Sequence, residues 1–235
     1  MNESATHKPA TYCVIPAAGL SSRMAAWKPL LPWGATTICG AVVDTVLLAG
    51  LRPVLVAGYR GEELAESFAD RPELAVVLND DWALGMLGSI RTGVDFILQN
   101  CLVDGEGDTA GFFVVPADMP RVPAKAFSLI SAALAGSGGA MPRGGASRAG
   151  TPGDDTAQGS VFPSRGGVLG HPVWIPAAFI PALRGLDPGS RLRDYLLGQP
   201  WTSVEVDDDG IFADLDTPEA YSEALRLNSS ASSSK

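Results

Sequence analysis

The chain has few of the residues that build common metal and disulfide sites. Its 235 residues include two histidines and three cysteines, and no C-x-x-C pair occurs. A metal site built from histidines is therefore excluded, and neither a zinc site nor a disulfide framework is predicted. Scattered cysteines, odd in number, are typical of a reducing compartment, so we expect a cytoplasmic protein.

Several widespread functional motifs are also missing. The sequence has no G-x-x-x-x-G-K-[ST] phosphate loop, no G-x-G-x-x-G dinucleotide fingerprint and no G-x-S-x-G nucleophile elbow. No apolar run reaches the roughly 18 residues of a membrane-spanning helix, and the N-terminus is polar and lacks the apolar core of a signal peptide. The net charge of −9 argues against a nucleic-acid or anionic-membrane partner.

The stretch from Cys13 to Lys28 has the features of an anion site. The apolar run Tyr12–Pro16 predicts a short buried strand, and the small residues after it leave backbone N–H groups accessible to a phosphate. These small residues are Ala17, Ala18, Gly19, Ser21 and Ser22. Arg23 and Lys28 add two positive charges, so the loop predicts a polyphosphate site. The alternative is an ordinary turn between a strand and a glycine.

Apolar strands alternate with amphipathic helices in the N-terminal half. Short strands that are apolar throughout predict an α/β protein whose mostly parallel sheet is covered on both faces. Strands are predicted at 12–16, 53–58, 75–78 and 112–116, and helices at 38–49, 62–68, 86–98 and 124–134. Ligands bind such sheets at the carboxyl ends of the strands, so the loops at Ala17, Asn79 and Asp118 should open on one edge.

The C-terminal half begins with a change of composition. Residues 143–165 are rich in glycine, serine, proline and alanine and predict a flexible insertion, either a disordered linker or a lid. Strands are then predicted at 173–175 and 202–206, and helices at 177–183, at 190–197 and from 218 to about 227. We expect a single domain over 11–227, a disordered N-terminus at 1–10 and a disordered serine-rich tail at 228–235.

Carboxylates stand where a metal ion can be held. Asp118 follows the apolar strand at 112–116, and Mg²⁺ binds one or two carboxylates together with substrate phosphates. Asp216 is the candidate second ligand, with Asp214 two residues before it. Both also have a structural interpretation, Asp118 as a turn cap and Asp216 as the start of the last helix.

Other polar residues lie at predicted loop ends. Asn79 and Ser89 surround a loop-to-helix junction, where Ser89 can offer its hydroxyl or amide to a ligand or simply cap the helix. His171 stands between Gly170 and Pro172, where it can contact an acceptor substrate or act as a local acid or base.

These blocks together resemble the molybdenum-cofactor nucleotidyltransferase family, and most of all its CTP:molybdopterin cytidylyltransferase branch. The family pattern A-A-G-x-S-x-R-M-G-x-x-K matches residues 17–28, except that Ala25 replaces the glycine. The other matching blocks, in order, are Asn79…Gly85-Met86…Ser89…Gly93, Pro116–Pro120, Gly170–Pro172 and Asp214–Glu219.

The resemblance implies a Rossmann-like, three-layer nucleotidyltransferase fold and an enzyme that moves CMP from CTP to molybdopterin with Mg²⁺ and releases pyrophosphate. It implies that the nucleotide site comprises Ala17, Ala18, Gly19, Ser21, Ser22, Asn79 and Ser89, with Arg23 and Lys28 on the phosphates. Arg23, Lys28 and Asp118 would be catalytic, Asp118 and Asp216 would hold Mg²⁺, and Gly170, His171 and Pro172 would face the acceptor.

Two alternatives remain from the sequence. The same fold can act on a sugar or polyol phosphate, or it can bind nucleotide and molybdenum cofactor without turnover and deliver the cofactor to a molybdoenzyme partner. The residues around the base do not distinguish cytosine from guanine, so CTP rests on the family resemblance.

Overall fold

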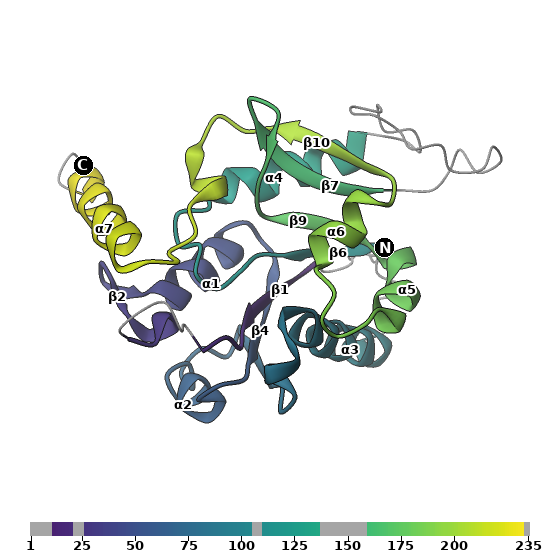
Figure 1. The fold of residues 1–235 in the computed structure, drawn as a ribbon, viewed down its shortest axis with the longest axis horizontal. Helices are drawn as coiled ribbons and strands as arrows, with labels where there is room; N and C mark the ends of the chain where they lie inside the picture. The colour runs from purple at the N-terminus through teal and green to yellow at the C-terminus, as the bar shows by residue number, and fades with distance from the viewer. Residues whose placement is uncertain (1–10, 21–25, 105–109, 137–158, 233–235) are drawn as a thin grey trace, which may run out of the picture.

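The computed structural model describes residues 11–20, 26–104, 110–136 and 159–232, and the side chains of these except 101–104 and 229–232. Its centre is an eight-stranded sheet in the order β10-β7-β9-β6-β1-β4-β5, with β8 paired to β7 (Figure 1). The strands of the sheet are β1 (Tyr12–Ala17), β4 (Arg52–Ala57), β5 (Ala75–Leu78), β6 (Gly111–Val114), β7 (Ser160–Arg165), β8 (Val168–Leu169), β9 (Val173–Pro176) and β10 (Trp201–Glu205).

Most strand pairs are parallel, and β1 lies at the centre of the parallel part. Val14 pairs with Val54 of β4 on one side and with Val114 of β6 on the other. The pairs of β9 with β6 and β7, and of β8 with β7, are antiparallel. The predicted α/β class with a mostly parallel sheet is therefore confirmed.

Helices cover both faces of the sheet. They are α1 (Ile38–Leu48), α2 (Gly61–Glu66), α3 (Met86–Asp104), α4 (Ala124–Gly136), α5 (Ile180–Gly185), α6 (Leu192–Leu197) and α7 (Pro218–Ser232). Short 3₁₀ helices are η1 (Lys28–Leu30), η2 (Trp82–Leu84), η3 (Ala177–Phe179) and η4 (Asp209–Phe212), and a small hairpin joins β2 (Pro32–Trp33) to β3 (Thr36–Thr37). Within the described residues, no helix combines the length and apolar character that crossing a membrane requires.

The alternation of side chains along β1 explains the three layers. Cys13 and Ile15 pack in the cluster that contains α1, α2 and α4, whereas Tyr12 and Val14 pack in the cluster with α3, α5 and α6. Successive side chains of a strand point to opposite faces, so a strand that is apolar at every position requires a helix layer on each side.

Two predicted flexible segments are partly ordered. Ser160–Arg165, predicted as the end of the insertion, forms β7, because Val161 and Phe162 are fully buried and pair with β9 and β10. The sequence prediction missed this strand because Val161 and Phe162 are a short apolar pair within a segment rich in glycine and serine.

The tail prediction is also wrong for 228–232, which continue α7. These residues contain no glycine or proline, and serine costs under about 0.7 kcal/mol in a helix. Residues 1–10 and 143–158 lie outside the described part.

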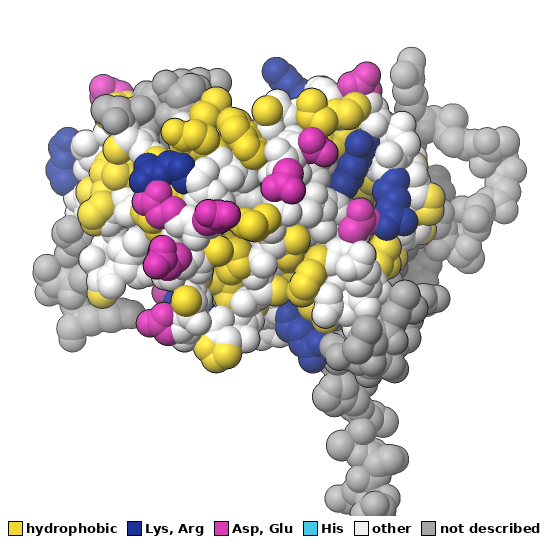
Figure 2. Space-filling view, turned by 90° about the horizontal axis from the view of Figure 1, so that it is seen from below, with side chains coloured by type: hydrophobic (Ala, Val, Ile, Leu, Met, Phe, Trp, Pro, Cys, Tyr) yellow, Lys and Arg dark blue, Asp and Glu magenta, His cyan; other side chains and the backbone are white. Residues whose placement is uncertain are grey.

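The face formed by α2, η2 and α3 shows apolar side chains gathered at its centre with charged ones beside them (Figure 2). Leu78, Leu84 and Met86 are large apolar residues that are about half exposed. They come from the end of β5, from η2 and from the start of α3, close to the edge where the strands end. The carboxyl edge of the sheet is therefore bordered by accessible apolar surface.

Two glycines of α3 give opposite predictions for stability. A Cβ on Gly93 would lie 2.7 Å from Cγ1 of Val14, whereas a Cβ on Gly88 meets nothing closer than 3.9 Å. Gly93→Ala should therefore lower the free energy of unfolding by about 1–3 kcal/mol through overpacking. Gly88→Ala should raise it by about 0.5–1 kcal/mol, because alanine favours the helix. Urea unfolding of both variants tests this, and equal effects would contradict the packing of α3 on β1.

Candidate active site

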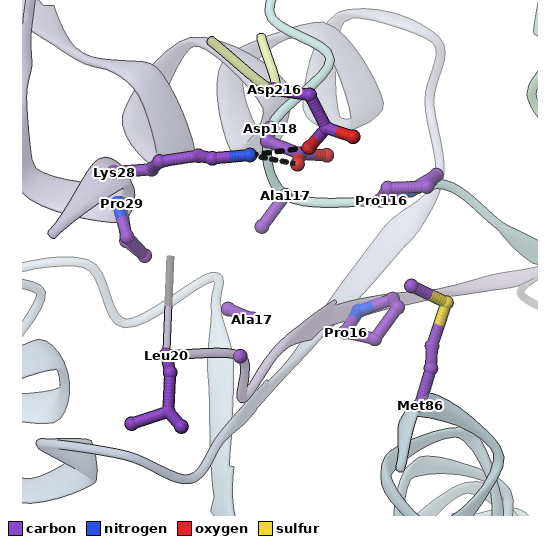
Figure 3. A pocket seen from close by; sticks show the side chains of 11 residues that line it. Pro16, Ala17, Leu20, Lys28, Pro29, Met86, Pro116, Ala117, Asp118 and Asp216 are labelled. Carbon is purple, nitrogen blue, oxygen red and sulfur yellow. Dashed lines mark hydrogen bonds and ion pairs between the residues drawn. The ribbon is translucent and has the colours of Figure 1, made fainter. Parts of the chain in front are cut away.

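The site lies where β1 and β6 end side by side. Pro16 and Ala17 close β1, Pro116 and Ala117 follow β6, and the backbone N–H of Ala117 donates to the carbonyl of Pro16 over 3.3 Å. These residues line a cavity of about 310 Å³ together with Gly19, Leu20, Lys28, Pro29, Met86, Asp118 and Asp216 (Figure 3). The loops after the first and fourth predicted strands therefore do open on one edge.

Lys28 lies between two carboxylates at this cavity. Its Nζ donates to Oδ2 of Asp118 over 3.1 Å and to Oδ1 of Asp216 over 2.6 Å (Figure 3). The Lys28 side chain is 9% exposed, while those of Asp118 and Asp216 are 29% and 41% exposed. The ammonium is thus enclosed by protein, and the carboxylates keep oxygen surface that a ligand can reach.

Backbone contacts bring these distant residues together. Lys28 opens η1 directly after the buried Trp27, and the proline that follows it suits the first turn of a helix. The N–H of Leu215 donates to the carbonyl of Asp118 over 3.0 Å, which fixes Asp216 beside the end of β6.

The charges of this group shift the pKa values of its members. Burial alone would lower the pKa of the Lys28 ammonium, but the hydrogen bonds that it donates to Asp216 and Asp118 and the negative charges of these carboxylates outweigh burial and raise the pKa. Burial raises the pKa of Asp214, and the neighbouring charges of Asp216 and Asp118 raise it further. Lys28 therefore stays charged, and a third carboxylate lies within electrostatic reach of the pair.

The small-residue loop is partly visible. Ala17 and Gly19 line the cavity, and a Cβ built on Gly19 would have no heavy atom within 4 Å, so the backbone there is open to a ligand. Ala18 is buried, and its carbonyl accepts from the N–H of Tyr59 over 3.3 Å. The predicted site residues Ser21, Ser22 and Arg23 and the departure at Ala25 lie outside the described residues.

Asn79 and Ser89 lie behind the surface. Both are buried, Asn79 donates from Nδ2 to Oγ of Ser89 over 3.0 Å, and its Oδ1 accepts from the N–H of Asp81 over 3.2 Å. Neither is among the residues that line the cavity. The hydrogen bond between them and the one from Asp81 hold the turn that carries Met86 to the cavity, so in this geometry they organise the loop.

A second cavity of about 610 Å³ adjoins the first, and the two share Met86, Pro116, Asp118 and Asp216. Of the predicted acceptor residues, Gly170 and His171 line it and Pro172 does not. Asp214 also borders this cavity. Gly170 is held close to η4, since a Cβ there would lie 2.5 Å from the carbonyl oxygen of Ile211.

His171 is neutral at ordinary pH. Burial, and then the charge of Arg193, lower its pKa to about 4, against a smaller opposing effect of a backbone hydrogen bond to Val114. Its Nδ1 atom is buried and has no hydrogen-bond partner among the described residues, although the residue as a whole is partly exposed. A neutral imidazole with one free ring nitrogen is suited to a hydrogen bond with a ligand.

Two arginines of the second cavity were missed by the sequence prediction. Arg191 and Arg193 line it from the start of α6. The signal was present as an R-x-R pair after Gly189-Ser190 in an acidic chain, but the same pattern is typical of a solvated helix face.

The donor set at the first cavity fits a hard divalent ion. Asp118 and Asp216 supply two carboxylates, and Mg²⁺ uses one or two of these and completes its shell with water and phosphate oxygens. The part of the chain that the structure describes has no cluster of three or more His, Cys, Asp or Glu residues arranged for a metal. This composition suits an ion that is bound together with a phosphate substrate.

Comparison with known proteins adds a family and a fold. A family model described as a MobA-like NTP transferase domain matches residues 13–203. The chain is 29% identical over 209 residues to the molybdenum cofactor cytidylyltransferase of Escherichia coli (strain K12), a match that covers 89% of this chain and 92% of that protein.

Solved structures share the fold. A homologue of Mycobacterium tuberculosis Rv0371c from Mycobacterium sp. strain JC1 has a TM-score of 0.69 at 22% identity and covers 94% of this chain and 98% of its own. A nucleotidyl transferase from Methanothermobacter thermautotroptrophicus has a TM-score of 0.68 at 18% identity, with 94% and 99% covered. The Rv0371c protein of M. tuberculosis H37Rv in complex with manganese has a TM-score of 0.65 at 21% identity, with 92% and 98% covered.

The buried imidazole makes stability depend on pH. Because the pKa of His171 falls from 6.5 to about 4 on folding, only the unfolded chain takes up this proton between those values. The stabilisation is complete above pH 6.5 and decreases as the pH falls, by about 3 kcal/mol at pH 4. Urea unfolding at pH 7 and pH 4 should show this loss in wild type.

The chain offers a matched control, because His7 is the other histidine. His171→Gln should remove most of the histidine-dependent loss of stability on acidification, and His7→Gln should retain it. A profile that is unchanged by His171→Gln would show that the imidazole titrates alike in the folded and unfolded chain.

Proposed function

The chain belongs to the MobA-like NTP transferase family and is a nucleotidyltransferase, and we propose that it moves CMP from CTP to the phosphate of molybdopterin and releases pyrophosphate. We also propose that it works in the cytoplasm as a single domain that begins near residue 11 and includes α7. The observation that carries the proposed reaction is the position of Lys28, Asp118 and Asp216 at the junction of two cavities.

The two cavities suit the two substrates. The smaller one is lined by the small residues Ala17 and Gly19, of which Gly19 is exposed, and has the Lys28 ammonium at its side, which favours a polyphosphate. The larger one is mostly apolar and favours the organic part of an acceptor. An acceptor phosphate directed toward Asp118 from the larger cavity would meet the nucleotide where the two spaces join.

A divalent ion fits the shared carboxylates. We propose that Asp118 and Asp216 hold Mg²⁺ together with phosphate oxygens, and the Rv0371c protein, which shares the fold, forms a complex with manganese. When bound, the ion supplies charge neutralisation and polarises the phosphorus under attack.

The protein's own residues position the reactants and stabilise charge. The Lys28 ammonium, with its raised pKa, offsets negative charge that develops on the leaving pyrophosphate, and Arg23 is proposed to act with it. The backbone at Ala17–Gly19 orients the phosphates. An acceptor phosphate is already ionised near neutral pH because its second pKa is about 6, so the reaction needs no strong general base.

Two substitutions should abolish most of the activity without unfolding the protein. Asp118→Asn removes a carboxylate charge and Lys28→Ala removes the ammonium, and losing one such group typically costs about 10²–10³ in rate. Pyrophosphate release from CTP in the presence of Mg²⁺ and molybdopterin measures the effect. Circular dichroism and thermal unfolding show whether each variant is folded.

Lys125→Ala is the matched control, because Lys125 is an exposed lysine of α4 and lines neither cavity. It should keep wild-type turnover. Folded Asp118→Asn with near-wild-type turnover would remove the metal from this position and with it the proposed mechanism.

The choice of substrates has a separate test. Pyrophosphate release should be fastest with CTP among the four nucleoside triphosphates, and with molybdopterin over a panel of sugar and polyol phosphates. Removal of divalent ions with EDTA should stop the reaction, and added Mg²⁺ should restore it. Tight CTP binding without pyrophosphate release for any acceptor would instead indicate a binding and delivery protein.

A further inference from the structure

The acidic and the basic residues that line the larger cavity come from different segments of the chain. Asp118 and Asp216 lie where it meets the smaller cavity, Asp214 lines it within electrostatic reach of them, and Arg191 and Arg193 line it from the start of α6. In Figure 1, α6 lies apart from the segment that leads into α7, which carries Asp216. Most of the remaining lining is apolar, with Ile90, Phe162 and Ile211 as examples.

Within the described residues, the two arginines form no ion pair. Other arginines of this part of the chain are paired with acids: Arg60 with Glu63, Arg71 with Asp44 and Glu73, Arg165 with Asp207 and Asp209, and Arg184 with Asp95.

Among the described residues, neither Arg191 nor Arg193 has a carboxylate within ion-pair distance. Arg193 donates to the carbonyl of Leu169 over 3.1 Å and lies 5.9 Å from the ring centroid of Phe162, so its side chain is held at the cavity wall. In a chain of net charge −9, two such cations in one cavity favour an anionic ligand.

His171 adds an independent sign of a ligand. Its buried Nδ1 has no partner in the described part of the chain, and the residue lines the same cavity. A buried polar atom left unpaired costs free energy, so such an atom at a cavity wall indicates a group that binds there. A neutral imidazole has one nitrogen that donates and one that accepts, so Nδ1 can pair with a polar group of a ligand.

We propose that Arg191 and Arg193 bind a second anionic group of the acceptor, remote from its reacting phosphate, while His171 Nδ1 forms a hydrogen bond with a polar atom of the acceptor's ring. This inference rests on the proposed function, because it takes the phosphate of the acceptor to lie at Asp118. The acceptor class is then a flat heterocyclic phosphate with a polar ring atom and a second negative charge.

This class excludes simple sugar phosphates as good substrates. A polyol chain would bury several hydroxyls against the apolar lining, and each unpaired hydroxyl costs about 1–3 kcal/mol. It would also leave the two arginines without an anion. Molybdopterin, a pterin phosphate that carries an ene-dithiolate, has both the polar ring atoms and the second anion.

The test is the acceptor dependence of cytidylyl transfer by the full chain. Arg191→Gln and Arg193→Gln should each raise KM for molybdopterin about tenfold, with KM for CTP and kcat within about twofold, since the charge contact is made equally in the ground and transition states. The double variant should also lose most of the increase in KM that salt causes in wild type. Arg191→Lys and Arg193→Lys should restore part of the affinity.

Arg184→Gln is the matched control, because Arg184 is an exposed arginine of the neighbouring α5 that lines neither cavity. It should leave both KM values unchanged. An unchanged KM for molybdopterin in the double variant would overturn the inference while the proposed function stands.

A second measurement separates the two proposals. If wild type releases no pyrophosphate, the proposed transfer reaction fails, and equilibrium dialysis of molybdopterin against wild type and the double variant decides the inference. Weaker binding by the double variant supports the arginine site. Equal binding, or no binding by wild type, overturns it.

Discussion

An ammonium group enclosed between two carboxylates organises this molecule. Lys28 is almost buried, and Asp118 and Asp216 are partly exposed on either side of it. Removing an ammonium from water is costly, and partly exposed ion pairs return little net stability. The arrangement is therefore better explained by its chemistry: one cation fixes two acids at a spacing that leaves oxygen atoms open to a ligand.

The surrounding structure keeps the group in place from three directions. The parallel pairing of β1 with β6 aligns the loops that follow them. The backbone bond from Leu215 to Asp118 joins the C-terminal segment to the same edge. Leu215 is also part of an apolar cluster with Trp33, Ile38 and Ala224, so the hairpin after Lys28 and the helix after Asp216 pack on one another.

The cavities on the two sides of this group differ in the way two substrates would. One is small and bordered by small residues and a lysine, and the other is large and mostly apolar with two arginines that form no ion pair within the described residues. Both include Asp118 and Asp216, so a reaction between their occupants would occur at the carboxylates. The neutral His171 lines the larger cavity without adding charge to it.

The sequence by itself determined the fold class and the family, and it singled out Lys28 and Asp118 as residues of one predicted site. These conclusions follow from local signals. Strands that are apolar at every position require a helix layer on each face, and small residues after a strand leave backbone N–H groups accessible. Tertiary structure decided the rest. It made Ser160–Arg165 a buried strand through pairing with β9 and β10, turned Asn79 and Ser89 toward one another, and gathered Arg191, Arg193 and His171 in one cavity. Such outcomes depend on contacts between segments far apart in the chain, and no local pattern of residues encodes them.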